Sequence, residues 1–256
     1  MFDYVRTQEM KHRFAHERQD ELRRLLSEQG TVAVADLAKR WQVSVMTVRR
    51  DLASLASSGA VARVHGGAVA GASLRFGARL EQHRVAKATA ARKLIVHIPQ
   101  KGCIYLDGST TVYVLVDALV DRRLTVATNN LDTFRQLHQL PMINALLIGG
   151  QLNRATDNFT GAQARRCLEG LAFDAAFFSA FAVDPLVGAS EPVPEDAEIK
   201  QVVSSRTSQV FLAVNQQKLG TRAAATWDAG RAILATDLAP DDAKLTDYRP
   251  LFAGIL

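Results

Sequence analysis

The stretch that decides the fold of the first third of the chain is Ser44-Val45-Met46-Thr47-Val48-Arg49-Arg50-Asp51-Leu52-Ala53-Ser54-Leu55. Its apolar residues Val48, Leu52 and Leu55 recur at spacings of four and three, which predicts a helix with one buried face. Ser44 is a residue type that caps helix starts, and the face opposite the apolar residues carries hydroxyls and two adjacent arginines. Alone, such a segment would be an ordinary charged surface helix, so its role depends on the flanking segments.

The flanking segments predict a winged helix-turn-helix. Residues 16–29 place leucines on one face of an amphipathic helix that ends at Gly30, and residues 31–34 are short and β-branched. Residues 35–41 predict a short second helix, and residues 61–67 predict a small hairpin with glycines at its tip. Helix, strand, helix, tight turn, helix and hairpin is the order of a winged helix-turn-helix, whose recognition helix enters the major groove.

Positive charge is concentrated in the same third of the chain. Residues 1–75 hold 12 Lys/Arg against 8 Asp/Glu, and the remaining residues hold 19 against 18. A basic segment suits nucleic acid or a membrane surface, and the trihelical pattern favours double-stranded DNA. The candidate DNA contacts are Ser44, Thr47, Arg49, Arg50, Arg63, His65, Gly66 and Gly67. Which of the two adjacent arginines reads bases stays open, and Asp51 can hold one of them in an ion pair.

The composition indicates a reduced, cytoplasmic protein. Of the 256 residues, 48% are hydrophobic and 22% are charged, which excludes wholesale disorder. No apolar run approaches the roughly 18 residues of a membrane span, and the charged N-terminal segment has no signal-peptide core. Two cysteines cannot form a four-cysteine zinc site, and the six histidines lack metal-ligand spacing. We therefore expect no metal, no cofactor and no membrane partner.

From residue 91 onward, apolar strands alternate with helices. The expected strands are residues 103–111, which run from a strand into a turn, residues 143–150, which end in two glycines, and residues 124–128, 173–183, 209–214 and 231–236. Their nearly continuous apolar runs predict a parallel sheet covered on both faces. The fold class is therefore α/β. The winged helix-turn-helix domain is expected over residues 14–69 with its helix-turn-helix at about 31–50, followed by a linker over 70–85 and a larger parallel-sheet domain over 86–256.

Polar residues follow several of these strands. Asp107-Gly108-Ser109-Thr110-Thr111 comes between a strand and a helix, where backbone N–H groups and hydroxyls can hold an anion. The other polar or small positions beyond strand ends are Asn129, Asn130, Gly149, Gly150 and Ser179. Ligands of open α/β sheets gather beyond the carboxyl ends of the strands, but ordinary turns and helix caps use the same residue types. Lys218 either neutralises a phosphate or is a surface lysine. No Walker A, GxGxxG or GxSxG pattern is present, so a nucleotide cofactor or a serine nucleophile is not expected.

These segments together resemble the DeoR-type family of transcriptional repressors. Ser44 to Leu55 matches the pattern S-x-x-T-[VI]-R-R-D-L-x-x-L, and Arg63 to Ala68 matches R-x-H-G-G-A. Further similar pieces follow in the order of the family, namely Lys87, Leu106 to Thr111, Thr128 to Asn130, Gly149-Gly150, Thr160-Gly161 and Lys218 to Gly220. The resemblance covers residues 14 to 240.

The resemblance implies a repressor of a carbohydrate or polyol operon that acts as a homodimer or tetramer on operator DNA. Its sensor domain would have a fold like that of ribose-5-phosphate isomerase, and its effector would be a phosphorylated sugar or polyol. The effector-site positions that the resemblance carries over, taken with the strand-end pattern, are Asp107, Gly108, Ser109, Thr110, Thr111, Asn129, Asn130, Gly149, Gly150 and Lys218. It implies no catalytic residues.

Three departures from the family pattern lie around this expected site. The usual D-x-S-K-F-G reads Asn215 to Gly220, the usual acidic-Glu-Ala reads Glu195-Asp196-Ala197, and Ser179 replaces a usual glycine. The alternative function is a sugar-phosphate isomerase with an appended DNA-binding domain. Isomerisation needs a carboxylate base and an acid, so the missing aspartate at position 215 and the lack of an expected second carboxylate beside Asp107 weigh against it.

Overall fold

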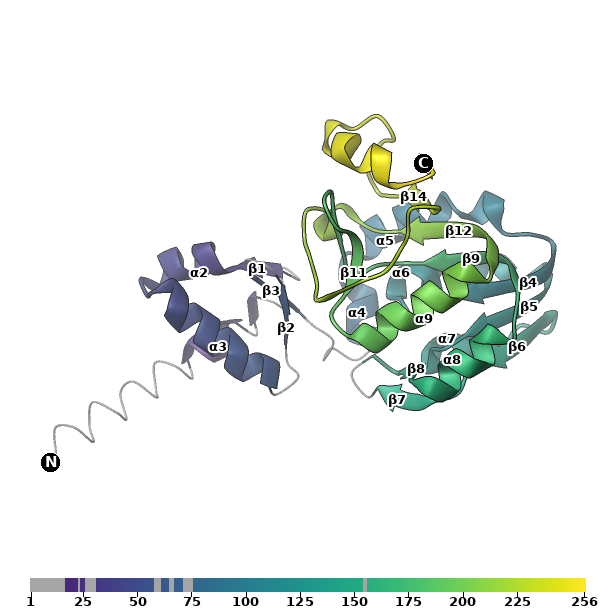
Figure 1. Ribbon diagram of the computed structural model, residues 1–256, viewed down its shortest axis with the longest axis horizontal. Helices are drawn as coiled ribbons and strands as arrows, with labels where there is room; N and C mark the ends of the chain where they lie inside the picture. The colour runs from purple at the N-terminus through teal and green to yellow at the C-terminus, as the bar shows by residue number, and fades with distance from the viewer. Residues whose placement is uncertain are drawn as a thin grey trace, which may run out of the picture. The chain divides into compact units, whose positions relative to one another are not determined.

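The computed structural model describes residues 17–22, 24–25, 31–57, 61–64, 67–70, 76–153 and 156–256. For Thr31, residues 54–57, 61–64 and 67–70, and Ala78 it describes the backbone alone. The chain forms two compact units, Met1–Leu74 and Arg75–Leu256 (Figure 1). The sequence-predicted positions that lie outside the described residues include Gly30, His65, Gly66 and residues 71–75 of the expected linker.

The first unit has the predicted order of a winged helix-turn-helix. After helical residues 17–22 and 24–25 come β1 (Thr31–Ala33), α2 (Val34–Trp41), α3 (Val45–Ser57), β2 (Val61–Val64) and β3 (Gly67–Ala70). The three strands form an antiparallel sheet in the order β1-β3-β2. The hairpin of β2 and β3 is the wing.

One apolar cluster fixes the position of α3 within this unit. Its buried members are Leu22, Leu25, Val34, Leu37, Val48 and Leu52. Val48 and Leu52 point inward as their spacing predicted, and burying an aliphatic side chain of this size is worth about 1.5–3 kcal/mol. The turn before α3 bends at Gln42, which adopts a left-handed φ of 53°. The face of α3 opposite the core is therefore held outward.

The second unit contains a seven-stranded sheet in which every neighbouring pair is parallel. It begins with α4 (Phe76–Glu81), α5 (Arg84–Arg92) and the 3-10 helix η1 (Ile95–His97). The strands are β4 (Lys101–Leu106), β5 (Arg123–Thr128), β6 (Ile143–Leu147), β9 (Phe173–Phe178), β12 (Thr207–Ala213), β14 (Ile233–Ala235) and β15 (Gly254–Ile255). Their order is β15-β14-β12-β9-β4-β5-β6, so β4 and β9 lie side by side near the centre.

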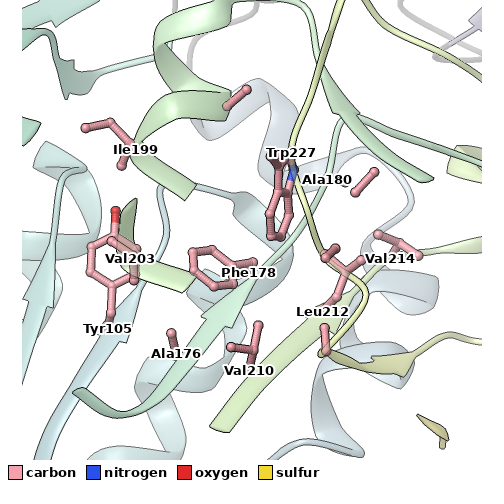
Figure 2. Packing of buried hydrophobic residues seen from close by; sticks show 14 of the residues in the cluster. Tyr105, Ala176, Phe178, Ala180, Ile199, Val203, Val210, Leu212, Val214 and Trp227 are labelled. Atoms are coloured by element: carbon pink, nitrogen blue, oxygen red, sulfur yellow. The ribbon is translucent and has the colours of Figure 1, made fainter. Parts of the chain in front are cut away.

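Apolar side chains cover both faces of this sheet, as the continuous apolar strands predicted. Alternate residues of β9 point to opposite sides, because Phe177 belongs to one core cluster and Phe178 to the other. The Phe177 side is covered by α5, α6 (Thr110–Tyr113), the 3-10 helix η2 (Val114–Leu119) and α7 (Leu131–Leu137). The Phe178 side is covered by α8 (Ala162–Glu169) and α9 (Pro194–Ser205), where Val203 and Trp227 pack against Phe178 and Tyr105 (Figure 2).

The expected strand over residues 173–183 begins at the predicted residue but is too long, because β9 ends at Phe178. The chain resumes as β10 (Ala182–Asp184), which joins β11 (Gly188–Glu191) and β13 (Ala225–Thr226) in a separate antiparallel sheet. Residues 179–181 leave the ladder since their backbone groups bond to charged side chains instead.

Several small elements had no counterpart in the sequence prediction. They are the hairpin of β7 (Gln151–Asn153) and β8 (Asn158–Thr160), and the 3-10 helices η3 (Gln216–Lys218) and η4 (Ala243–Leu251). Within the described part of the chain, no helix is both long and apolar enough to span a membrane.

Candidate functional sites

The start of α3 is fixed by a hydroxyl cap. The N–H of Thr47 donates to Ser44 Oγ at 3.1 Å, and the Oγ atoms of the two side chains lie 2.9 Å apart. Ser44 therefore caps the recognition helix as predicted. The cap satisfies a backbone N–H that the first turn of a helix otherwise leaves unpaired.

Arg49 and Arg50 are both exposed on α3, flanked by the buried residues Val48 and Asp51. Neighbouring helical positions point about 100° apart, so the two guanidinium groups leave the helix in different directions. One can reach a base edge while the other meets the phosphate backbone.

The expected ion pair between Asp51 and one of these arginines is wrong. Asp51 is buried, and Arg18 Nε donates to its Oδ2 at 2.8 Å while Arg18 Nη2 donates to Oδ1 at 3.3 Å. This bidentate pair ties the first helical segment to α3. Arg18 therefore takes the place at Asp51 that was expected for Arg49 or Arg50.

The wing carries the remaining predicted DNA contacts. Arg63 lies in β2 and Gly67 starts β3, where Val64 pairs with Gly67 in the antiparallel register. His65 and Gly66 lie outside the described residues. Their contacts with DNA stay predictions.

Replacing Arg50 by alanine is expected to weaken operator binding by about 1–3 kcal/mol without unfolding the domain. The side chain is exposed, so packing does not require it. Fluorescence anisotropy on operator DNA at fixed salt measures the loss. Arg123→Ala, which removes an exposed arginine of the other unit, is the matched control. Equal affinities for Arg50→Ala and wild type would contradict the assignment.

In the second unit, Asp107 joins the ends of the two central strands. Its Oδ1 accepts from the Ser109 N–H at 3.0 Å and its Oδ2 accepts from the Ser179 N–H at 2.8 Å. Ser109 in turn caps α6, since its Oγ accepts from the Val112 N–H at 3.1 Å. The expected loop after β4 is therefore a tightly bonded turn that connects β4 to the end of β9.

Asn129 and Asn130, which were expected to line the effector site, bond to the β7–β8 hairpin. Asn129 Nδ2 donates to Phe159 O at 3.0 Å, and Asn130 Nδ2 donates to Asn158 Oδ1 at 2.9 Å. Asn130 Oδ1 also accepts from the Thr133 N–H at 2.9 Å and so caps α7. Both amides hold the hairpin in place, as the turn-and-cap alternative anticipated.

Two of the three glycines expected in the effector site, Gly108 and Gly150, lie where the chain packs too closely for a side chain. A Cβ on Gly108 would lie 1.9 Å from Asn158 Oδ1, and one on Gly150 would lie 2.5 Å from Thr160 O. A Cβ on Gly149 would meet nothing within 4 Å. Gly108 and Gly150 therefore allow the hairpin to approach the ends of β4 and β6.

The segment 179–181 is held by four charged side chains from different elements. Ser179 N–H donates to Asp107 and Phe181 N–H donates to Glu191 Oε1 at 3.3 Å. Ser179 O accepts from Lys200 Nζ at 2.6 Å. Lys218 Nζ donates to Ser179 Oγ at 2.9 Å and to Ala180 O at 2.6 Å. We call residues 179–181 the strap. Its backbone groups make hydrogen bonds to charged side chains in place of the hydrogen bonds between strands.

Lys200 sits among carboxylates that the sequence analysis did not anticipate. Its Nζ bonds to Glu191 Oε1 and lies 3.5 Å from Asp107 Oδ2. Burial opposes the charge of Lys200, but Glu191 and Asp107 outweigh it and raise its pKa. Burial also raises the pKa of Glu191 and of the nearby Asp196, although Lys200 partly offsets both shifts. The expectation of no second carboxylate beside Asp107 is therefore wrong.

Three cations form a second cluster, which we call the cation cluster: Arg79, Lys87 and Lys218. Lys87 Nζ bonds to Arg79 O and donates to Thr110 Oγ1 at 2.8 Å. Burial, and then repulsion by Lys218 and Arg79, lowers the pKa of Lys87 to about 7. Burial likewise lowers the pKa of Lys218 to about 8, with Glu191 partly offsetting it and Lys200 and Arg79 adding to it.

Two atoms near this cluster lack partners. Arg79 Nη2 donates to Thr156 O at 3.0 Å, but Arg79 Nε is buried without a hydrogen-bond partner among the described groups. Thr111 Oγ1 is likewise buried and unpaired there. Burial lowers the pKa of Arg79, and Asp196 offsets part of that shift. A buried donor on a cation without an acceptor is costly unless a ligand supplies one.

Two protein-family descriptions match the chain. "DeoR-like helix-turn-helix domain" matches residues 18–73, and "DeoR C terminal sensor domain" matches residues 82–233. The lactose phosphotransferase system repressor of Staphylococcus aureus (strain N315) is 31% identical over 212 residues, which cover 80% of this chain and 84% of that protein. The HTH-type transcriptional regulator IolR of Bacillus subtilis (strain 168) is 29% identical over 204 residues, which cover 78% of this chain and 81% of that protein.

Two solved structures align with part of this chain at low identity. Ribose 5 phosphate isomerase A from Neisseria gonorrhoeae aligns with a TM-score of 0.38 and 14% identity over 52% of each chain. The eIF2B delta structure from Chaetomium thermophilum aligns with a TM-score of 0.45 and 12% identity, covering 62% of this chain and 58% of that one. On the two family matches and the curated relatives, the chain belongs to the DeoR family, as a DNA-binding transcriptional repressor with an N-terminal helix-turn-helix domain and a C-terminal sensor domain.

Proposed function

We propose that this repressor controls a carbohydrate or polyol catabolic operon and that a phosphorylated sugar or polyol changes its affinity for operator DNA. One relative is named for the lactose phosphotransferase system, which supports a sugar operon. The matched sensor domain, residues 82–233, contains Lys87 and Lys218. We expect the protein to act in the cytoplasm. We also expect it to be a homodimer or tetramer, and light scattering on the purified protein tests this oligomeric state.

The cation cluster is the observation that supports a phosphorylated ligand. Burial lowers the pKa of each of its three members, and neighbouring cations lower the pKa of Lys87 and of Lys218 further, so positive charge in the free site is unfavourable. A phosphate dianion supplies the opposite charge, and its oxygens can accept from ammonium and guanidinium donors. Arg79 Nε, buried without a partner among the described groups, is available for such a contact. Asp107, Asn129 and Asn130 would act as a frame for this site.

Effector affinity is expected to fall as the pH rises from 7 to 9. A bound phosphate favours the protonated lysines, so binding takes up protons wherever the free lysines are neutral. Since Lys87 has a pKa of about 7 and Lys218 of about 8, most of both are neutral at pH 9. The affinity should therefore drop at least about tenfold over this range. The second pKa of a phosphate monoester is about 6, so the ligand itself stays dianionic.

The experiment begins with a thermal-shift screen of phosphorylated sugars and polyols. Release of the full-length protein from operator DNA is then followed by anisotropy at each pH with the best ligand. Lys87→Met should make the pH dependence shallower and leave the part that Lys218 contributes, whereas Lys101→Met, which changes an exposed lysine at the far end of β4, should keep the wild-type profile. An affinity that stays constant or rises toward pH 9 would show that these lysines do not hold the anion.

We further propose that the sensor domain binds this ligand without converting it. The carboxylates that isomerisation would need are already engaged, since Asp107 accepts from two backbone N–H groups and Glu191 accepts from Phe181 N–H and Lys200. An isomerase assay on pentose and hexose phosphates, run with the ligand that releases operator DNA, is expected to show no turnover. Turnover that Glu191→Gln abolishes would favour the isomerase alternative.

A further inference from the structure

Two large apolar side chains are exposed at the start of the recognition helix. Val45 is 44% exposed and Met46 is 62% exposed, whereas Val48 and Leu52 on the same helix are buried. Neither Val45 nor Met46 belongs to the core cluster of the first unit or to the partly buried residues packed against it. Folding of the described part of this unit therefore makes little use of them.

These apolar side chains lie in line with the exposed arginines. In a helix, residues four apart lie one above the other on the same face. Val45 therefore lies one turn before Arg49, and Met46 lies one turn before Arg50. The outward face of α3 alternates apolar and cationic groups, and the Ser44–Thr47 cap fixes its first turn.

The major groove offers one apolar group to such a face. Each base pair displays hydrogen-bond donors and acceptors there, and thymine alone adds a C5-methyl group. The N-terminal residues of a recognition helix are the ones that meet base edges. An apolar side chain in this position gains free energy by burying its surface against a thymine methyl group. It makes no comparable apolar contact with the edges of the other bases.

We propose that Met46, with Val45 beside it, is a specificity-determining residue that reads a thymine methyl group in each operator half-site. One helical turn advances about 5.4 Å, and stacked bases are about 3.4 Å apart. The thymine read by Met46 therefore lies one or two base pairs from the position contacted by Arg50. Double-stranded DNA is the occupant of this apolar surface, because exposed arginines flank it on the recognition helix.

The test isolates the methyl group. Duplexes that bind the full-length protein are selected from a random pool, and each thymine of the best duplex is replaced in turn by deoxyuridine, which lacks only that methyl. Anisotropy at fixed salt should show one position per half-site where wild-type binding weakens about fourfold, the factor expected from one buried methyl-sized group. Met46→Ala should bind the thymine duplex more weakly and should be insensitive to deoxyuridine at that position.

Two further variants control the test. Met46→Leu keeps an apolar side chain and should retain sensitivity to deoxyuridine. Met142→Ala, which removes a partly exposed methionine of the sensor domain, should leave the whole pattern unchanged. The proposal is overturned if no thymine position is sensitive in wild type, or if Met46→Ala keeps the wild-type sensitivity. It is equally overturned if Met46→Ala alters only the oligomeric state, since its partner would then be a second copy of the chain.

Discussion

Replacing Lys200 by methionine is expected to lower the free energy of unfolding of the sensor domain by about 3–5 kcal/mol. The substitution leaves the buried carboxylates Asp107 and Glu191 without the cation that lies between them, and it removes the donor to Ser179 O. Urea unfolding followed by circular dichroism measures the loss. Lys101→Met, at an exposed position, is the matched control and should change stability by less than about 0.5 kcal/mol.

The pH dependence distinguishes lost charge compensation from lost packing. Without Lys200, the folded-state pKa of Glu191 and Asp196 should rise above the already raised values. A carboxyl group whose pKa is higher in the folded than in the unfolded protein gains stability as the pH falls. The deficit of Lys200→Met should therefore shrink between pH 7 and pH 5, and Glu191→Gln should partly rescue the variant at pH 7. A deficit that is constant with pH would point to packing alone.

Replacing Lys218 by methionine is expected to raise the effector concentration needed to release operator DNA by about 10- to 100-fold, the equivalent of one charged hydrogen bond. Operator affinity without effector should stay near the wild-type value, because the residue lies in the sensor domain and has no predicted contact with DNA. Anisotropy with a labelled operator duplex gives both values in one titration. Lys244→Met, which changes an exposed lysine, is the matched control.

Two outcomes of this titration would change the assignment. Release at the wild-type effector concentration would place the phosphate elsewhere. Loss of DNA binding without effector would mean that the bonds of Lys218 to Ser179 and Ala180 maintain the DNA-binding state of the protein. An effector acts only through its difference in affinity for two states, so Lys218 would then contribute to the balance of those states as well as to the ligand.

The order of helices and strands could be predicted because each depends on local periodicity. Val48 and Leu52 are buried as their spacing indicated, and Phe177 and Phe178 point to opposite faces as expected for a covered parallel strand. The end of strand β9 could not be predicted, because residues 179–181 are apolar or small and resemble a continuing strand. Its cause lies in charged side chains that only the folded chain brings there.

The sequence predicted which polar residues follow strands, but not which groups their side chains bond to. Asn130 does follow a strand, yet its amide holds the hairpin at Asn158. A sequence pattern predicts where an asparagine lies along the chain, but not which group its side-chain amide bonds to. Lys200 and Glu191 were missed because charged residues are usually exposed, and their burial depends on Asp107 far away in the chain. Asp51 was assigned to its sequence neighbours, whereas its partner is Arg18, 33 positions earlier.

The strap has a consequence for how this protein can change over generations. Four charged side chains share three residues, so the value of each depends on the other three, and the effects of substitutions will not add. A descendant that lost Asp107, Glu191, Lys200 or Lys218 would keep an unmatched charge until a second position also changed. We therefore expect these four positions to change in combination rather than singly.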